Sequence, residues 1–188
     1  MARAFVIGLD GVPEEMLRRL CAAGVMPRCA AAIEAGRLAR IPSTRPPLSS
    51  VAWSTVLTGA GPGAHGIFGF VECDPRTYEY TFPLVSDLKA PALWDVLGRA
   101  GKRAAFLNVP ATYPAPPVNG VLVSGFVAPS LGDAVWPHAI LPELEAQGYA
   151  VDADARLGHT DKGALLDDLA RVLEHRRWLI RRVWRDGP

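Results

Sequence analysis

Short apolar segments alternate with amphipathic segments of helical periodicity along this chain. Residues 4–9, 103–109 and 120–126 are apolar runs of strand length. The longest helical pattern covers residues 165–184, where apolar side chains keep a period of about 3.6 residues. Apolar strands that alternate with helices are typical of parallel sheets buried on both faces. The pattern therefore predicts an α/β fold, a three-layer sandwich with a mostly parallel central sheet.

The boundaries of the remaining predicted segments are marked by proline and glycine. Proline and glycine positions bound the predicted helices, and a run of prolines marks residues 110–117 as a loop. Alternating or short apolar segments predict further strands with a weaker sequence signal. The predicted helices begin at Pro13 and Pro27 and cover residues 50–58, 91–100 and 137–147, and the weaker predicted strands are residues 38–42, 77–82 and 149–151.

Composition excludes several classes of protein. The chain has 188 residues, is 49% hydrophobic and 21% charged, and carries a net charge of +1, so we expect one globular domain with no nucleic-acid or membrane partner. The three cysteines have no C-x-x-C spacing, which indicates neither a disulfide framework nor a thiolate zinc site. No apolar run reaches the ~18–20 residues of a membrane span, and no secretory signal is visible. These features predict a cytoplasmic protein.

Two side chains stand where α/β proteins place their chemistry. Asp10 follows the first predicted strand, and Ser49 precedes the helix predicted for residues 50–58. Ligands bind at the carboxyl ends of strands in such sheets, and a helix N-terminus attracts anions. Asp10 and Ser49 are therefore candidates to share one metal ion. The alternatives are structural, because Ser is a preferred N-cap and Asp beside Gly11 is a common turn residue.

Other polar residues compete for these roles or support them. Ser50, Ser43 and Thr44 are rival hydroxyls, and Asn108 ends the strand predicted for residues 103–109. We expect Asn108 either to donate a hydrogen bond to substrate or to fasten the proline-rich loop that follows it. His65 is expected to satisfy backbone groups between Gly63 and Gly66 rather than to bind a metal ion. His138, His159 and His175 are expected to be solvated.

Four motifs in order resemble one family of enzymes. They are Gly8-Leu9-Asp10-Gly11, the run PPLSSVAW at residues 46–53, Leu57-Thr58-Gly59, and Pro62-Gly63-Ala64-His65-Gly66-Ile67. Together they resemble the alkaline phosphatase superfamily, and within it the type I phosphodiesterase and nucleotide pyrophosphatase family. The resemblance covers the N-terminal half to two thirds of the chain.

The resemblance implies a mechanism and a set of site residues. Members of this family use two divalent metal ions, usually zinc, and a Ser or Thr nucleophile that takes a phosphoryl group and passes it to water. Ser49 matches the nucleophile and Asp10 the first metal ligand. With Ser50 and Asn108 as substrate-binding residues, the resemblance implies a hydrolase of phosphate mono- or diesters that acts on a small phosphorylated substrate.

The remaining ligands of such a metal site do not occur in this sequence. The family supplies them from an Asp-x-x-x-His stretch and a Ser-Asp-His-Gly turn, whereas a zinc site needs about three or four protein ligands. We therefore expect residues 1–188 to be the N-terminal portion of a larger hydrolase, its C-terminal part missing, and inactive alone. The alternatives are a non-catalytic α/β module that binds an anion, or a truncated gene product. The sequence leaves the oligomeric state open.

Overall fold

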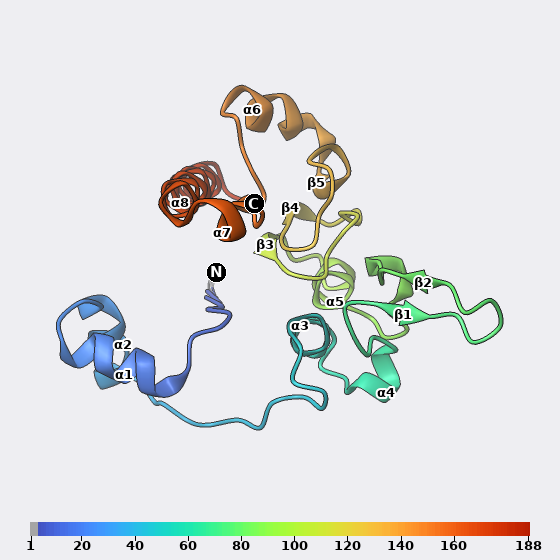
Figure 1. Ribbon diagram of the computed structural model, residues 1–188, viewed down its shortest axis with the longest axis horizontal. Helices are drawn as coiled ribbons and strands as arrows, with labels where there is room; N and C mark the ends of the chain where they lie inside the picture. Colours follow the sequence, from blue (N-terminus) through green and yellow to red (C-terminus); the bar gives the residue numbers. More distant parts are fainter. Residues whose placement is uncertain (1–3) are drawn as a thin grey trace. The chain divides into compact units, whose positions relative to one another are not determined.

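The structure is a computed structural model that describes residues 4–188. The chain divides into two compact units, one ending at Ser43 and one comprising Thr44–Pro188, and each is described by itself. Figure 1 shows the helices and strands in chain order.

The first unit consists of two helices joined by a short turn. Helix α1 (Glu14–Ala22) follows Pro13, and helix α2 (Pro27–Ala35) begins at a proline, as the sequence predicts. None of the described residues of this unit, 4–43, is buried. The strands predicted for residues 4–9 and 38–42 are wrong, because neither segment has strand structure and Val6, Ile7 and Ile41 are at least 80% exposed.

The second unit contains all of the strands in the part of the chain that the structure describes. Its helices are α3 (Ser49–Thr58), α4 (Pro62–His65), α5 (Leu93–Arg99), α6 (Leu141–Ala146), α7 (Leu157–Thr160) and α8 (Lys162–Asp186). Its strands are β1 (Glu72–Cys73), β2 (Tyr80–Thr81), β3 (Ala104–Val109), β4 (Gly120–Ser124) and β5 (Val135–Trp136). Three short 3-10 helices cover Val85–Asp87, Gly132–Ala134 and His138–Ile140.

A three-stranded sheet lies at the centre of this unit. Strand β3 pairs with β4 in parallel, and β4 pairs with the two-residue β5 in antiparallel orientation. Strands β1 and β2 form a separate antiparallel hairpin, which includes part of the predicted strand at residues 77–82. Residues 149–151 were predicted as a strand, and this prediction is wrong, because they form no strand although Tyr149 and Val151 are buried.

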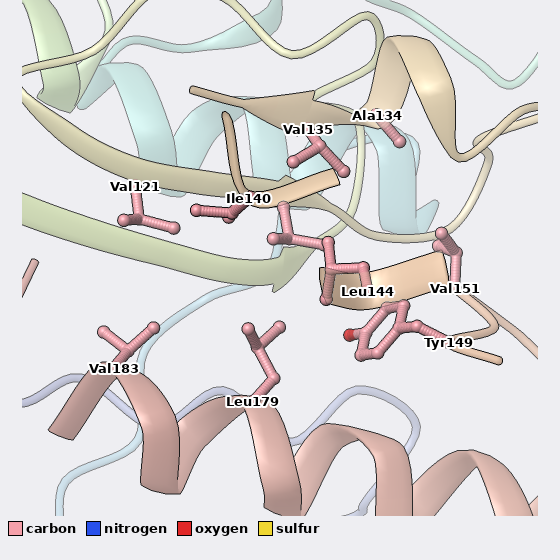
Figure 2. Packing of buried hydrophobic residues seen from close by; sticks show 10 residues of the cluster. Val121, Ala134, Val135, Ile140, Leu144, Tyr149, Val151, Leu179 and Val183 are labelled. Carbon is pink, nitrogen blue, oxygen red and sulfur yellow. The ribbon is translucent and has the colours of Figure 1, made fainter. Parts of the chain in front are cut away.

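Hydrophobic clusters cover both faces of the three-stranded sheet. Val121 and Val123 of β4 pack with residues of α6 and α8, including Leu144, Leu179 and Val183. Figure 2 shows Leu179 and Val183 projecting from α8 toward Val121. Leu122, between those two valines, packs on the opposite side with Phe106 of β3, Leu57 of α3 and Trp94 of α5. Neighbouring residues of one strand thus anchor helices on opposite faces.

The α/β class predicted from the sequence is confirmed, whereas the predicted mostly parallel sandwich is not. The described sheet is small and mixed, with one parallel and one antiparallel strand pair. Within residues 4–188, no helix combines the length and the apolar composition that crossing a membrane requires.

Candidate functional site

Ser49 is the first residue of helix α3. The residue before it, Leu48, takes the N-cap position with extended backbone angles and offers no side-chain oxygen, so the N-cap role considered for Ser49 is not the one it has. The first backbone hydrogen bond of the helix runs from the N–H of Ala52 to the carbonyl of Leu48, at 2.9 Å. The N-cap residue therefore gives the N–H groups of the first turn no side-chain cap, and these groups carry the positive end of the helix dipole.

Two more serines of α3 are buried one turn apart. Ser50 is 5% exposed and Ser54 is 1% exposed, and neither hydroxyl has a hydrogen-bond partner within residues 4–188. The spacing of four residues places both on one face of the helix. Ser49 itself is only half-buried, so of the serines at this end of α3 it is the one that solvent reaches.

His65 holds α4 against α3. Its ring is completely buried, Nδ1 accepts a hydrogen bond from the N–H of Ile67 at 3.1 Å, and Nε2 lies 3.0 Å from the hydroxyl of Thr55. Because Nδ1 accepts, the neutral ring carries its proton on Nε2 and donates it to Thr55. Burial lowers the pKa of His65, which favours this neutral form. The ring satisfies a backbone group, as predicted, but that group is the N–H of Ile67, one residue beyond the predicted range that ends at Gly66.

Asn108 lies at an irregularity near the carboxyl end of β3. Leu107 pairs with Val123 and Val109 pairs with Ser124, so Asn108 is an additional residue on β3 without a counterpart on β4. Its φ is 55°, which is the left-handed region that few residues other than glycine adopt. A bulge of this kind turns a side chain away from the strand's regular alternation.

The side chain of Asn108 bonds to a distant tyrosine. The hydroxyl of Tyr149 donates to Oδ1 of Asn108 at 2.8 Å. Nδ2 of Asn108 is buried and has no hydrogen-bond partner in the described part of the chain. Burial raises the pKa of Tyr149 to about 12, with the bond to Asn108 opposing the rise, so the hydroxyl keeps its proton at neutral pH.

Two other residues fasten the proline-rich loop, which was the alternative role considered for Asn108. The hydroxyl of Thr112 donates to the carbonyl of Val109 at 2.7 Å, and the hydroxyl of Ser124 donates to the carbonyl of Thr112 at 2.8 Å. Both hydroxyl-bearing residues are at most 1% exposed. These bonds tie the loop to the ends of β3 and β4. The carboxamide of Asn108 instead bonds to Tyr149.

Asp10 and Ser49 belong to different units. Asp10 lies in a turn with Gly11, which has a φ of 67°, and its side chain is exposed. The sharing of one metal ion by Asp10 and Ser49 therefore stays a prediction. Across residues 4–188, no group of three or more His, Cys, Asp or Glu side chains is arranged to hold a metal ion. Asp10 and Ser49 alone give fewer ligands than the three or four of a zinc site, so the residues present do not make up a complete centre.

The remaining histidines differ in their surroundings. His138 and His159 are exposed, as predicted. His175 was predicted to be solvated, and this prediction is wrong, because its ring is half-buried, stacks on Tyr149 with centroids 5.9 Å apart, and accepts the N–H of Ala150 on Nδ1 at 3.2 Å. Burial, helped by nearby Arg171, lowers the pKa of His175.

Tyr149 was not among the site residues predicted from the sequence. Its partner Asn108 stands 41 positions away, and no local pattern links the two. The brief strand predicted for residues 149–151 was the only available signal, and it indicated burial without a partner.

Comparison with known proteins identifies a family. A family model described as type I phosphodiesterase / nucleotide pyrophosphatase matches residues 4–178, which is most of the chain. No curated protein and no solved structure matches it. The matched range includes Asp10, Ser49, Ser50 and Asn108.

Proposed function

Because the chain belongs to the type I phosphodiesterase / nucleotide pyrophosphatase family, we propose that it carries the nucleophile-bearing part of a hydrolase acting on small phosphate mono- or diesters. The observation that carries this proposal is the uncapped N-terminus of α3, which begins at Ser49. A hydroxyl and a row of free N–H groups at one helix end are suited to receive a phosphoryl group.

Ser49 is the proposed nucleophile. Its Oγ forms the bond to phosphorus while the bond from phosphorus to the ester oxygen breaks, and the proton of the hydroxyl is finally carried by the leaving alcohol. Water then cleaves the phosphoserine, which releases phosphate, or a phosphate monoester if the substrate is a diester, and restores the hydroxyl. The N–H groups of the first turn of α3 stabilise the negative oxygens during both steps.

Ser50 and Asn108 are proposed to assist with substrate. Ser50 has a buried hydroxyl without a described partner, and the same holds for the amide nitrogen of Asn108. Each is therefore a donor that a phosphate oxygen would satisfy.

The metal requirement is also a proposal. Asp10 and Ser49 are proposed to supply oxygen ligands to a divalent cation, which the family resemblance implies is zinc. Their number is too small for a zinc centre, so we propose that residues 1–188 form the N-terminal portion of a larger hydrolase domain and turn over little substrate alone. When bound, such an ion lowers the pKa of a coordinated hydroxyl and makes it a better nucleophile.

The test is the detection of phosphoserine. A chain extended beyond Pro188 to supply the remaining metal ligands is incubated with p-nitrophenyl phosphate or bis(p-nitrophenyl) phosphate and zinc, and the modified residue is located by peptide mass spectrometry. We expect modification at Ser49 and its complete loss in Ser49→Ala. Ser43→Ala, in the exposed loop before Thr44, is the matched control and should be modified like the parent chain. Modification that persists in Ser49→Ala overturns the assignment.

A second function is favoured by the same uncapped helix end. A non-catalytic module would bind an anion at the first turn of α3 without a metal. Calorimetric titration with zinc separates the two proposals. Zinc binding that Asp10→Asn abolishes supports the enzyme, whereas phosphate binding that is independent of zinc and of Asp10 supports the module.

A further inference from the structure

The bulge at Asn108 directs a carboxamide out of the regular pattern of β3. In a regular strand, residue 108 would follow the pleat, with its side chain opposite to those of its neighbours. The extra residue and the φ of 55° replace that orientation with another. Backbone in the left-handed region costs free energy for a residue with a side chain, and such positions occur often at binding sites.

Close packing behind the bulge maintains it. A Cβ atom at Gly125, just after β4, would lie 2.4 Å from the carbonyl oxygen of Asn108, so only glycine fits there. The N–H of Gly125 donates to the carbonyl of Val109 at 2.9 Å. The backbone at Asn108 is therefore held from the side of β4.

Tyr149 holds the other end of the side chain. Its hydroxyl donates a hydrogen bond to Oδ1 of Asn108 at 2.8 Å and so fixes the position of this oxygen. The residue is 5% exposed, and its ring is stacked on His175 of α8. The N–H of Ala150 bonds to the same His175 ring, so both Tyr149 and its successor are attached to α8. A carboxamide whose oxygen is fixed has its nitrogen fixed as well, because the group is planar.

The fixed nitrogen is the donor that lacks a described partner. A buried amide N–H₂ without an acceptor is unfavourable, and an oxyanion is a strong acceptor for it. Asn108 also lies near the carboxyl end of the parallel pair β3–β4, the edge at which α/β sheets bind ligands.

We propose that Tyr149 is a positioning residue that orients the carboxamide of Asn108, so that Nδ2 donates to an oxygen of the bound phosphoryl group. This inference rests on the proposed function, since it assumes that a phosphate group binds beside Asn108. Tyr149 acts only through Asn108 and touches no substrate.

The test is a double-mutant cycle on phosphate affinity. Inorganic phosphate is titrated into the ¹⁵N-labelled chain, and the side-chain amide signals of Asn108 and the backbone signals of Ser49 and Ser50 are followed by NMR. Tyr149→Phe removes one hydroxyl and keeps the ring on His175. We expect it to weaken phosphate affinity about fivefold, the effect of one neutral hydrogen bond. In the Asn108→Ala background, the same change should have no further effect.

Tyr113→Phe is the matched control. It removes the hydroxyl that donates to Asp133 at 3.2 Å, elsewhere in the same unit, and should leave phosphate affinity unchanged. Thermal unfolding of each variant shows whether it remains folded. If Tyr149→Phe weakens affinity equally with and without Asn108, then Tyr149 acts by another route and the inference is overturned.

The two proposals fail in different ways. If phosphate shifts the signals of Ser49 and Ser50 but never those of the Asn108 side chain, the positioning inference is wrong and the proposed function stands. If phosphate shifts none of these signals in the parent chain, the proposed function fails and this inference fails with it.

Discussion

The two units differ in how their apolar residues are used. Residues 4–43 include two helices with apolar faces, yet none of these residues is buried. Residues 44–188 contain both hydrophobic clusters, with Leu122, Val123, Val135 and Leu179 completely inaccessible. An apolar pattern thus predicts the face that a segment can bury, whereas burial itself needs a partner of matching shape.

The distribution of tryptophan makes this difference measurable. All five tryptophans lie in the second unit, so intrinsic fluorescence reports the unfolding of that unit alone. Two of the three cysteines, Cys21 and Cys29, lie in the first unit and are half-buried, so their reaction with a thiol reagent reports the first unit.

The largest expected effect is the truncation of a core leucine. Leu179→Ala should lower the free energy of unfolding by about 2–5 kcal/mol, because a fully buried side chain leaves a cavity. Leu20→Ala in the first unit, where the side chain is half-buried, should change it by less than about 1 kcal/mol. Urea unfolding followed by tryptophan fluorescence gives the value for Leu179→Ala, and the reaction of Cys21 and Cys29 with a thiol reagent in urea gives the value for Leu20→Ala. An equal loss in the two variants would mean that the units unfold as one, which would contradict the difference between them.

The next effect concerns His65 and pH. His65→Leu leaves the N–H of Ile67 and the hydroxyl of Thr55 without their partner, which should cost about 1–3 kcal/mol. Burial lowers the pKa of His65 below its ordinary value of 6.5, so below that pH the unfolded chain binds more protons than the folded chain. The second unit should therefore lose stability as the pH falls from about 7 to about 5.

A second histidine variant tests whether the loss of stability at low pH depends on the buried position of His65. His138→Leu, at an exposed site, should leave this loss unchanged, and His65→Leu should reduce it. His175 should account for the loss of stability that remains in His65→Leu over the same pH range, because the pKa of His175 is also lowered. The first unit contains no histidine, and its shifted group, Glu14, has a pKa lowered from 4.5 by bonds to Arg18 and Arg40, so its stabilisation is lost only at more acidic pH. A pH response that begins at the same value in both units would contradict this account.

The smallest effect concerns a helix cap. Asp161 accepts hydrogen bonds from the N–H groups of Gly163 and Ala164 at 2.9 and 3.0 Å, and it is the N-cap of α8. Asp161→Ala should lower the free energy of unfolding by about 1 kcal/mol, measured by the same fluorescence transition. Neither α1 nor α2 has a side-chain cap, so changes at Pro13 or Met26 have no such bond to lose. Asp161→Asn, which keeps an accepting oxygen, should recover most of the loss.

Local patterns were sufficient for the longer helices and for two strands, whereas the four-residue helices α4 and α7 were not predicted. The period of residues 165–184 identified α8, and the apolar runs identified β3 and β4 to within one or two residues. Residues 4–9 have the same composition as those strands but no strand beside them to accept their backbone hydrogen bonds in the described part of the chain. Strand β5 has only two residues, which is too short for any periodicity to appear.

Local patterns also predicted part of the candidate site. Ser49 was expected at the start of a helix and begins α3, because proline precedes this helix and glycine ends it. The partner of Asn108 was not predictable, because a bulge and a tyrosine 41 positions away are joined only by the folded chain. The role of Asp10 depends on the placement of two units and stays a prediction.

Strand β3 has β4 on one side only in the sheet of the described residues. Its outer row of peptide groups is a template on which one more strand can form, and a newcomer aligned in the same direction would finish at the level of Asn108. Whichever residue comes directly after such a strand would become a neighbour of that carboxamide. The composition of the binding site is thus decided in part by what occupies this border of the sheet.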